Sequence, residues 1–223
     1  MNFDPEQPLG GLEMRVLAVL AEKESLTPDN YPMSLNALVN GCNQLTSRDP
    51  VMTATEHEVV DALQRLQQNK LVTEVSQAGA RVAKYEHRVR PAWSLEQSKL
   101  AALTVLMLRG SQTAAEIRSR AERLHPFDSV QSVEQTLQFL IDKFPPLVTR
   151  LPRAPGTKET RYACLLAGAD VLGSEHSATP MGSENALPQR GDRVARLEDE
   201  IIQLRAELAA LRAQFAQFKQ QFE

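Results

Sequence analysis

The sequence predicts a mainly helical α+β protein with small β-hairpins, built from two tandem winged-helix domains and a C-terminal coiled-coil helix. Three observations predict it: an internal repeat, the same order of helices and β-rich segments in each copy, and a heptad pattern near the C-terminal end. The chain has 223 residues, 42% of them hydrophobic, which is enough to bury a core. We expect four parts: a first domain over 1–90, a second over 91–166, a flexible linker over 167–191 and a helix over 192–223.

The repeat is clearest where a helix gives way to a β-rich segment. ALQRLQQNKLVTEV (Ala62–Val75) and TLQFLIDKFPPLVTRL (Thr136–Leu151) both read Leu-Gln-x-Leu, a gap and then Leu-Val-Thr. Matching segments flank them in the same order, VLAVL with ALTVL upstream and AKYEH with TRYAC downstream. One structural unit therefore occurs twice.

Each copy begins with an amphipathic helix, because its apolar residues recur at helical spacing: Leu12, Val16, Val19 and Leu20 in the first copy, and Leu100, Leu103, Leu106 and Met107 in the second. A short second helix follows, SLNALVN from Ser34 and TAAEIRSRAERL from Thr113, each starting at a residue that caps helices well. A third helix has its apolar face at Val59, Val60, Leu63 and Leu66, and at Val133, Leu137, Leu140 and Ile141.

Two β-rich segments end each copy. LVTEV and KYEHRV flank SQAGARVA, while LVTRL and TRYACLL flank PRAPGTKE, and both spacers have the Gly or Pro content of a hairpin loop. Three helices followed by a two-stranded hairpin make the winged-helix variant of the helix-turn-helix.

The first copy is 12 residues longer than the second, with 7 of these before its second helix and 5 after it. The surplus includes the polar turn NGCNQLTSRDP (Asn40–Pro50), between the second and third helices. One interpretation is structural: Asn40 and Gly41 end the helix in a left-handed cap, Ser47 and Asp49 bond nearby amides, and Pro50 prevents further helix. The alternative is that the turn contacts a phosphate backbone or a partner protein through Asn43, Gln44, Thr46, Ser47 and Arg48.

Four segments, LEMRVLAVLAEKE, YPMSLNALVNGCNQ, SRDPVM and AKYEHRV, carry a resemblance to the YceH-like family of bacterial proteins over about residues 10–166. The resemblance implies a tandem winged-helix fold and says little about activity. Leu45 stands where the family pattern leads us to expect a basic residue, which weakens a phosphate-binding role for the turn.

The third helices are the candidate recognition helices. In the first copy Glu56, Glu58 and Asp61 suit the helix dipole but repel phosphates. The second copy is nearly neutral and offers side-chain amides for base edges, at Gln131, Gln135 and Gln138.

The predicted hairpins, or wings, are basic. Four cations gather at each, and eight together are enough to follow one duplex backbone: Arg81, Lys84, Arg88 and Arg90 in the first copy, and Arg150, Arg153, Lys158 and Arg161 in the second. The alternative is that exposed hairpins carry charge for solubility and to protect their edges.

The C-terminal segment has an unbroken pattern of apolar steps of three and four, which predicts a coiled coil. Its seam includes Leu197, Ile201, Leu204, Leu208, Leu211, Phe215 and Phe218. In a parallel pair the flanking charges match, Glu200 with Arg205 and Glu207 with Arg212, so we expect a parallel homodimer. The alternative is a helix folded against its own domain.

Composition excludes several functions. Cys42 and Cys164 form no disulfide framework, no secretory signal pattern is present, and no apolar run approaches the roughly 18 residues that cross a bilayer, so we expect a cytoplasmic protein without a membrane partner. Neither a metal-ligand spacing nor a catalytic motif is present, so we expect no enzyme, metal or cofactor. The prediction is a regulator or architectural protein that binds duplex DNA; the alternative is a scaffold that binds protein partners.

Overall fold

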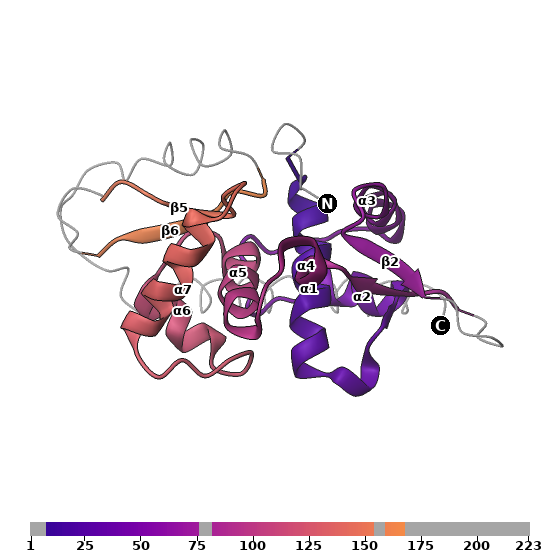
Figure 1. The fold of residues 1–223 in the computed structure, drawn as a ribbon. Helices are drawn as coiled ribbons and strands as arrows, with labels where there is room; N and C mark the ends of the chain where they lie inside the picture. Colours follow the sequence, from indigo (N-terminus) through magenta and orange to yellow (C-terminus); the bar gives the residue numbers. More distant parts are fainter. Residues whose placement is uncertain (1–7, 76–81, 154–158, 168–223) are drawn as a thin grey trace, which may run out of the picture. The chain divides into compact units, whose positions relative to one another are not determined.

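The computed structural model describes residues 8–75, 82–153 and 159–167 (Figure 1). The described chain is mainly helical, with two small three-stranded antiparallel sheets, as an α+β fold requires. The elements of the first repeat are α1 (Gly11–Leu26), a 3-10 turn (Pro28–Asn30), β1 (Met33–Ser34), α2 (Leu35–Cys42), α3 (Glu56–Gln68), β2 (Val72–Val75) and β3 (Lys84–His87). After α4 (Val89–Trp93), the second repeat has α5 (Gln97–Arg109), β4 (Gln112–Thr113), α6 (Ala114–Ala121), α7 (Val130–Asp142), β5 (Val148–Arg150) and β6 (Arg161–Cys164).

The two sheets have the same topology. The strand orders are β1-β3-β2 and β4-β6-β5, so the last strand of each repeat lies in the middle. Tyr85 pairs with Met33 on one side and Glu74 on the other, and Tyr162 occupies the equivalent position between its two partner strands. This order of elements is compatible with winged-helix repeats. The two-residue strands β1 and β4 were not predicted.

The predicted helix starts are confirmed. The side-chain oxygen of Ser34 accepts from the Ala37 amide at the start of α2, and that of Thr113 accepts from the Glu116 amide at the start of α6. Such caps satisfy amides that the first helical turn leaves without partners. However, α6 ends at Ala121, three residues short of the predicted segment.

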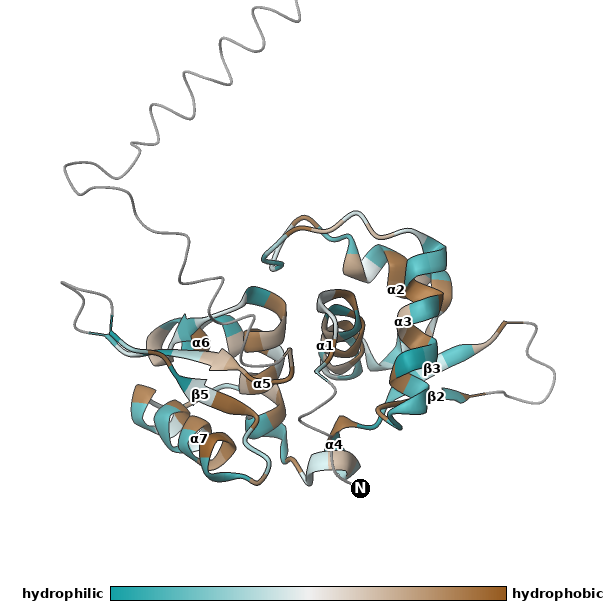
Figure 2. Ribbon diagram, turned by 90° about the horizontal axis from the view of Figure 1, so that it is seen from above, coloured by the Kyte–Doolittle hydropathy of each residue, from teal (hydrophilic) through white to brown (hydrophobic). Residues whose placement is uncertain are grey.

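One hydrophobic core includes residues of both repeats. α1 packs against α5, and buried side chains of both helices belong to one hydrophobic cluster. Residues 15–22 and 100–108 are buried without interruption, whereas α3 and α7 each have one hydrophobic and one hydrophilic side (Figure 2). The amphipathic pattern predicted for the first helix of each repeat is therefore wrong, because these helices are covered by their own repeat and by each other.

The link between the repeats differs from the sequence prediction. The segment KYEHRV was predicted as a strand, but β3 ends at His87 and α4 begins at Val89. Ser94 then adopts a left-handed conformation, with φ of 51°, before α5 starts. Among the described residues, no helix is both long enough and apolar enough to cross a membrane.

Candidate nucleic-acid interface

The exposed side of α7 carries the predicted glutamines. The helix begins at the Ser129 cap and buries Val133, Leu137 and Leu140. Gln131 and Gln135 are exposed and Gln138 is half-buried. Gln131 and Gln135 therefore lie on the side of the helix turned away from the core, where their amides are exposed to hydrogen-bond partners.

A hairpin cation meets this helix. Arg150, at the end of β5, donates from Nη2 to Oε1 of Gln138 over 2.7 Å. The Gln138 amide in turn donates to Asp142 over 2.6 Å, and the Arg150 guanidinium lies 6.0 Å from the centre of the Tyr162 ring. One residue of the predicted base-contacting set and one of the predicted phosphate-contacting set thus form a continuous surface.

The other described cations of this hairpin are dispersed. Arg153 is exposed, and its Nε donates to the Thr160 hydroxyl over 3.4 Å. Arg161 donates to the Ser111 carbonyl over 2.9 Å and lies 3.4 Å from Glu116. Because Arg150 pairs with the residue after Arg161, their side chains point to opposite faces of the sheet. Of these cations only Arg150 is placed beside α7 by a hydrogen bond.

In the first repeat the corresponding cations face carboxylates. Lys84 lies in β3 and is half-buried, and Arg88 pairs with Glu86 over 3.3 Å. Arg90 is not on the hairpin as predicted, because it lies in α4 and its Nε donates to Glu24 of α1 over 3.1 Å. Its role in the structure is to join helices.

Some predicted residues lie outside the described residues. Among the hairpin cations these are Arg81 and Lys158. The linker from 168 onward and the whole predicted dimerisation seam are also outside them: Leu197, Ile201, Leu204, Leu208, Leu211, Phe215 and Phe218. Their predicted roles stay predictions.

The exposed side of α3 is acidic at its N-terminal end. Glu56, Glu58 and Asp61 are all exposed. Glu58 accepts hydrogen bonds from the backbone amide and the hydroxyl of the Thr55 cap, which lower the pKa of its carboxyl. This helix end repels a phosphate backbone.

The polar turn after α2 is built around a buried arginine. Arg48 donates to both carboxylate oxygens of Glu22 in α1, at 3.2 and 2.7 Å, and to the Gly41 carbonyl and the Gln44 amide oxygen. Burial raises the pKa of Glu22, but the hydrogen bond and charge of Arg48, with the charge of Lys23, outweigh it, so the net pKa is lowered. The Arg48 guanidinium thus lies inside the protein, while Thr46 and Ser47 are exposed.

Other contacts fix the same turn. Asn43 exchanges two hydrogen bonds with the backbone of Ala54, at 2.8 and 2.7 Å. Arg15 of α1 donates to the carbonyls of Cys42 and Pro50, at 3.1 and 2.6 Å. The Asp49 amide donates to a carbonyl at the end of α5 over 2.8 Å, so the turn also touches the second repeat.

The predicted left-handed cap at Asn40 and Gly41 is wrong. α2 continues to Cys42, and Asn43 caps it with φ of −89°. Gly41 is needed for a different reason, since a Cβ there would lie 2.6 Å from Cγ1 of Val19. The left-handed residue of the turn is Ser47, with φ of 61°.

Sequence comparison identifies relatives over most of the chain. The family model described as "Protein of unknown function, DUF480" matches residues 9–157, which include the first repeat and the second as far as β5. A UPF0502 protein of Herminiimonas arsenicoxydans is 66% identical over 187 residues, or 84% of this chain and 79% of that protein. The chain belongs to the DUF480/UPF0502 family. This confirms the resemblance found in the sequence.

Further UPF0502 relatives cover similar shares. One from Aromatoleum aromaticum is 55% identical over 86% of this chain and 84% of its own length. One from Azoarcus sp. strain BH72 is 51% identical over 90% of each. The similarity to these relatives covers more of the chain than the two repeats. The names of the relatives state no activity.

Two residues of this UPF0502 chain that organise the turn were missed in the sequence. Arg15 and Glu22 lie seven residues apart on α1, which places them two turns apart on one face of the helix. An oppositely charged pair at the two ends of the apolar run 16–21 is the signal that could have identified them.

The described part of this UPF0502 chain contains side chains of the types that ligate metals, and two cysteine thiols. No group of three or more His, Cys, Asp or Glu within it is arranged to hold a metal ion. Cys42 and Cys164 are both buried, and burial raises their pKa values to about 11 and about 12. Thiols of such high pKa are poor nucleophiles at neutral pH.

Proposed function

We propose that this chain is a non-enzymatic winged-helix protein that binds duplex DNA, and that its second repeat makes the contact. The observation that carries the proposal is the hydrogen bond from Arg150 to Gln138, because it joins hairpin and helix in one surface. In helix-turn-helix proteins the recognition helix enters the major groove, while flanking elements contact the backbone. α7 would take the first role and the second hairpin the other.

The chemistry of this surface fits those roles. Side-chain amides such as Gln131 and Gln135 donate and accept on base edges, and they are exposed. Arg150 and Arg153 are exposed cations at the edge of the same repeat, where they would position the protein on phosphates. Residues 91–166 contain 10 Lys or Arg and 7 Asp or Glu, so the repeat as a whole attracts a polyanion.

The first repeat supports a different use. Its α3 exposes Glu56, Glu58 and Asp61, and its hairpin cation Arg88 is paired with Glu86. These observations favour the second candidate function, a scaffold that holds a protein partner on the first repeat. The two functions are compatible within one chain.

Dimerisation is a further part of the proposal. The heptad pattern over 192–223 supports a parallel pair, which would double the number of DNA-contacting repeats and raise avidity. Deleting this segment should reduce the solution mass from that of a dimer to that of a monomer. An unchanged mass would remove dimerisation from the proposal without affecting the role of α7.

Fluorescence anisotropy with a random-sequence duplex tests the DNA proposal. The full chain should bind more weakly as salt rises from about 50 to about 200 mM, because binding releases condensed counterions. Arg150→Glu and Arg153→Glu should each weaken binding and reduce the salt slope by about one. Arg88→Glu is the matched control, with the same change of charge on a residue already paired in the first repeat.

Two results would contradict this assignment. Absence of DNA binding at low salt would favour the scaffold function over the DNA-binding function. Equal losses in all three variants would show that DNA responds only to net charge and not to the surface formed by α7 and the second hairpin.

A further inference from the structure

The α2–α3 turn, residues 43–55, exposes two large apolar side chains. Leu45 is 80% exposed and Val51 is 50% exposed. The backbone beneath them is held by the buried Arg48 and by Asn43, so these side chains project from a fixed support. Asp49 in the same turn is exposed, and the acidic start of α3 follows directly. The turn is thus an apolar projection that carries the exposed carboxylate of Asp49.

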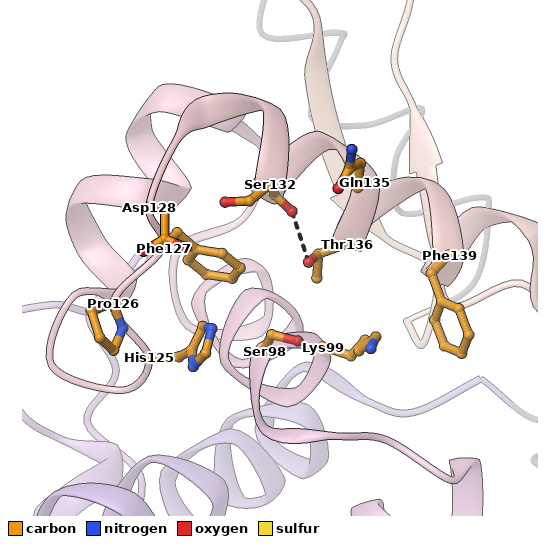
Figure 3. A pocket seen from close by; sticks show the side chains of 10 residues that line it. All are labelled: Ser98, Lys99, His125, Pro126, Phe127, Asp128, Ser132, Gln135, Thr136 and Phe139. Carbon is orange, nitrogen blue, oxygen red and sulfur yellow. Dashed lines mark hydrogen bonds between the residues drawn. The ribbon is translucent and has the colours of Figure 1, made fainter.

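The second repeat has a surface of the opposite kind. A hollow of about 390 Å³ lies between the start of α5, the connection from α6 to α7, and α7 itself (Figure 3). Its walls include Phe127 and Phe139, and the Phe139 ring remains 44% exposed. Lys99 and Lys143 place their ammonium groups 5.2 and 5.7 Å from the centre of that ring. We name this surface the α7 hollow.

Beyond α7 the apolar character continues. Phe144, directly after Lys143, is 91% exposed. Exposed aromatic side chains beside cations are typical of surfaces that bind other proteins. Lys99 also pairs with Glu96, so Lys143 is the cation that most readily accepts an additional carboxylate.

The two surfaces complement each other. One presents aliphatic side chains close in sequence to the carboxylate of Asp49. The other is a hollow lined by Phe127, Phe139 and Lys99, together with Asp128, and Lys143 lies beside it. Within the described residues of one copy, Leu45, Phe139 and Phe144 all stay exposed. We propose that the α2–α3 turn of one copy docks in the α7 hollow of a second copy, with Leu45 entering the hollow and Asp49 approaching Lys143.

This contact would join two different surfaces, so it is heterologous. Each copy would keep one turn and one hollow for further neighbours, and head-to-tail contacts of this kind produce rings or open chains. The contact does not require DNA and goes beyond the function proposed above. It would compete with DNA for α7, because Gln135 also lines the hollow. Because part of its attraction is between charges, it should weaken as salt rises.

Sedimentation velocity of the full chain over a range of concentrations tests the inference. The weight-average sedimentation coefficient of the wild type should rise with concentration, and the rise should be smaller at high salt. Leu45→Asp, which spoils the turn, and Lys143→Glu, which spoils the hollow while leaving the core intact, should each abolish the rise. Val82→Asp is the matched control, because Val82 is 59% exposed but lies on the first hairpin, outside both surfaces.

Mixing the two defective variants gives the sharpest comparison. Leu45→Asp keeps its hollow and Lys143→Glu keeps its turn, so an equimolar mixture should associate although neither variant does alone. Any pairing of residues 192–223 contributes the same baseline to every sample. A wild type without concentration dependence, an unchanged rise in both variants, a mixture no larger than its components, or an equal loss in Val82→Asp would each overturn the inference.

Discussion

Arg48 of the α2–α3 turn donates from Nη2 to Oε2 of Glu22 in α1 over 2.7 Å, and both residues are buried. The same guanidinium reaches the Gly41 carbonyl, so one side chain ties the turn to the helix before it and to the centre of the first repeat. A buried ion pair of this kind contributes little net energy when intact, but it is costly to break because the remaining charge loses its partner. The turn is therefore a structural element whose exposed residues are held in place from beneath.

Arg48→Met should destabilise the protein by about 3–5 kcal/mol, since it leaves the Glu22 carboxylate buried without its partner. Urea unfolding at neutral pH measures this change. The matched control is Arg88→Met, which removes the 3.3 Å pair with Glu86 between side chains that are 51% and 31% exposed. That change should cost only about 0–1 kcal/mol. Similar losses in both variants would contradict the structural role of Arg48.

Stability should fall in acid, and Glu22 should account for part of the fall. The folded protein holds the pKa of Glu22 below its ordinary value of 4.5. The stability that the ionised Glu22 contributes is therefore fully present above pH 4.5. It is lost as pH falls from there through the lower pKa that Glu22 has in the folded state. Glu24, whose pKa is lowered first by a hydrogen bond from His87, acts in the same direction.

The Glu22→Gln variant should therefore be less stable than the wild type at neutral pH, and its stability should fall less steeply in acid. Glu24 should account for part of the pH dependence that the variant keeps. Urea midpoints measured at several pH values from neutral downward provide the comparison. If wild type and variant lose stability in parallel below pH 4.5, Glu22 does not carry the assigned linkage.

Gly41→Ala should destabilise the protein by about 1–3 kcal/mol, because the new methyl would overlap Val19 of α1. Thermal unfolding reports the loss. Adding Val19→Ala to this variant should recover part of it by removing the overlapping atoms. Gly11→Ala is the control, since a Cβ there meets only Met52, at 3.9 Å. A loss as large in the control would indicate a backbone effect instead of a close helix contact.

Neither cysteine should react with iodoacetamide in the native protein at about pH 8, because the thiolate is the nucleophile. Burial raises the pKa of Cys42 to about 11 and that of Cys164 to about 12. Mass spectrometry should find both modified after unfolding in urea. Rapid labelling of either thiol in the folded chain would contradict its buried position, because the reagent could then reach it.

Much of the fold follows from local sequence. A helix cap or an apolar helix face is determined by residues that lie close together in the sequence. The caps at Ser34 and Thr113 and the apolar face of α7 were therefore predicted at the positions where the structure has them. The strands β1 and β4 were missed because two residues carry no alternating pattern. α4 was missed because five residues make little more than one helical turn.

The site was harder to predict, because its chemistry depends on contacts between distant residues. Arg48 reads as an exposed cation in a polar turn, and only its pairing with Glu22, 26 residues earlier, shows that it is buried. Arg90 was assigned to a hairpin because KYEHRV resembles one continuous strand, whereas in the structure α4 begins at Val89 and Arg90 contacts Glu24 of α1. By contrast, the glutamines of α7 could be placed, since helical periodicity alone separates them from the core.

Hydrogen exchange of the full chain, measured by mass spectrometry with and without duplex DNA, tests the central claim most directly. The account predicts slower exchange in α7 and β5 when DNA is present, with α3 unchanged. Slower exchange in α3 without any change in α7 would contradict it, because the acidic helix of the first repeat would then be the one that meets the duplex.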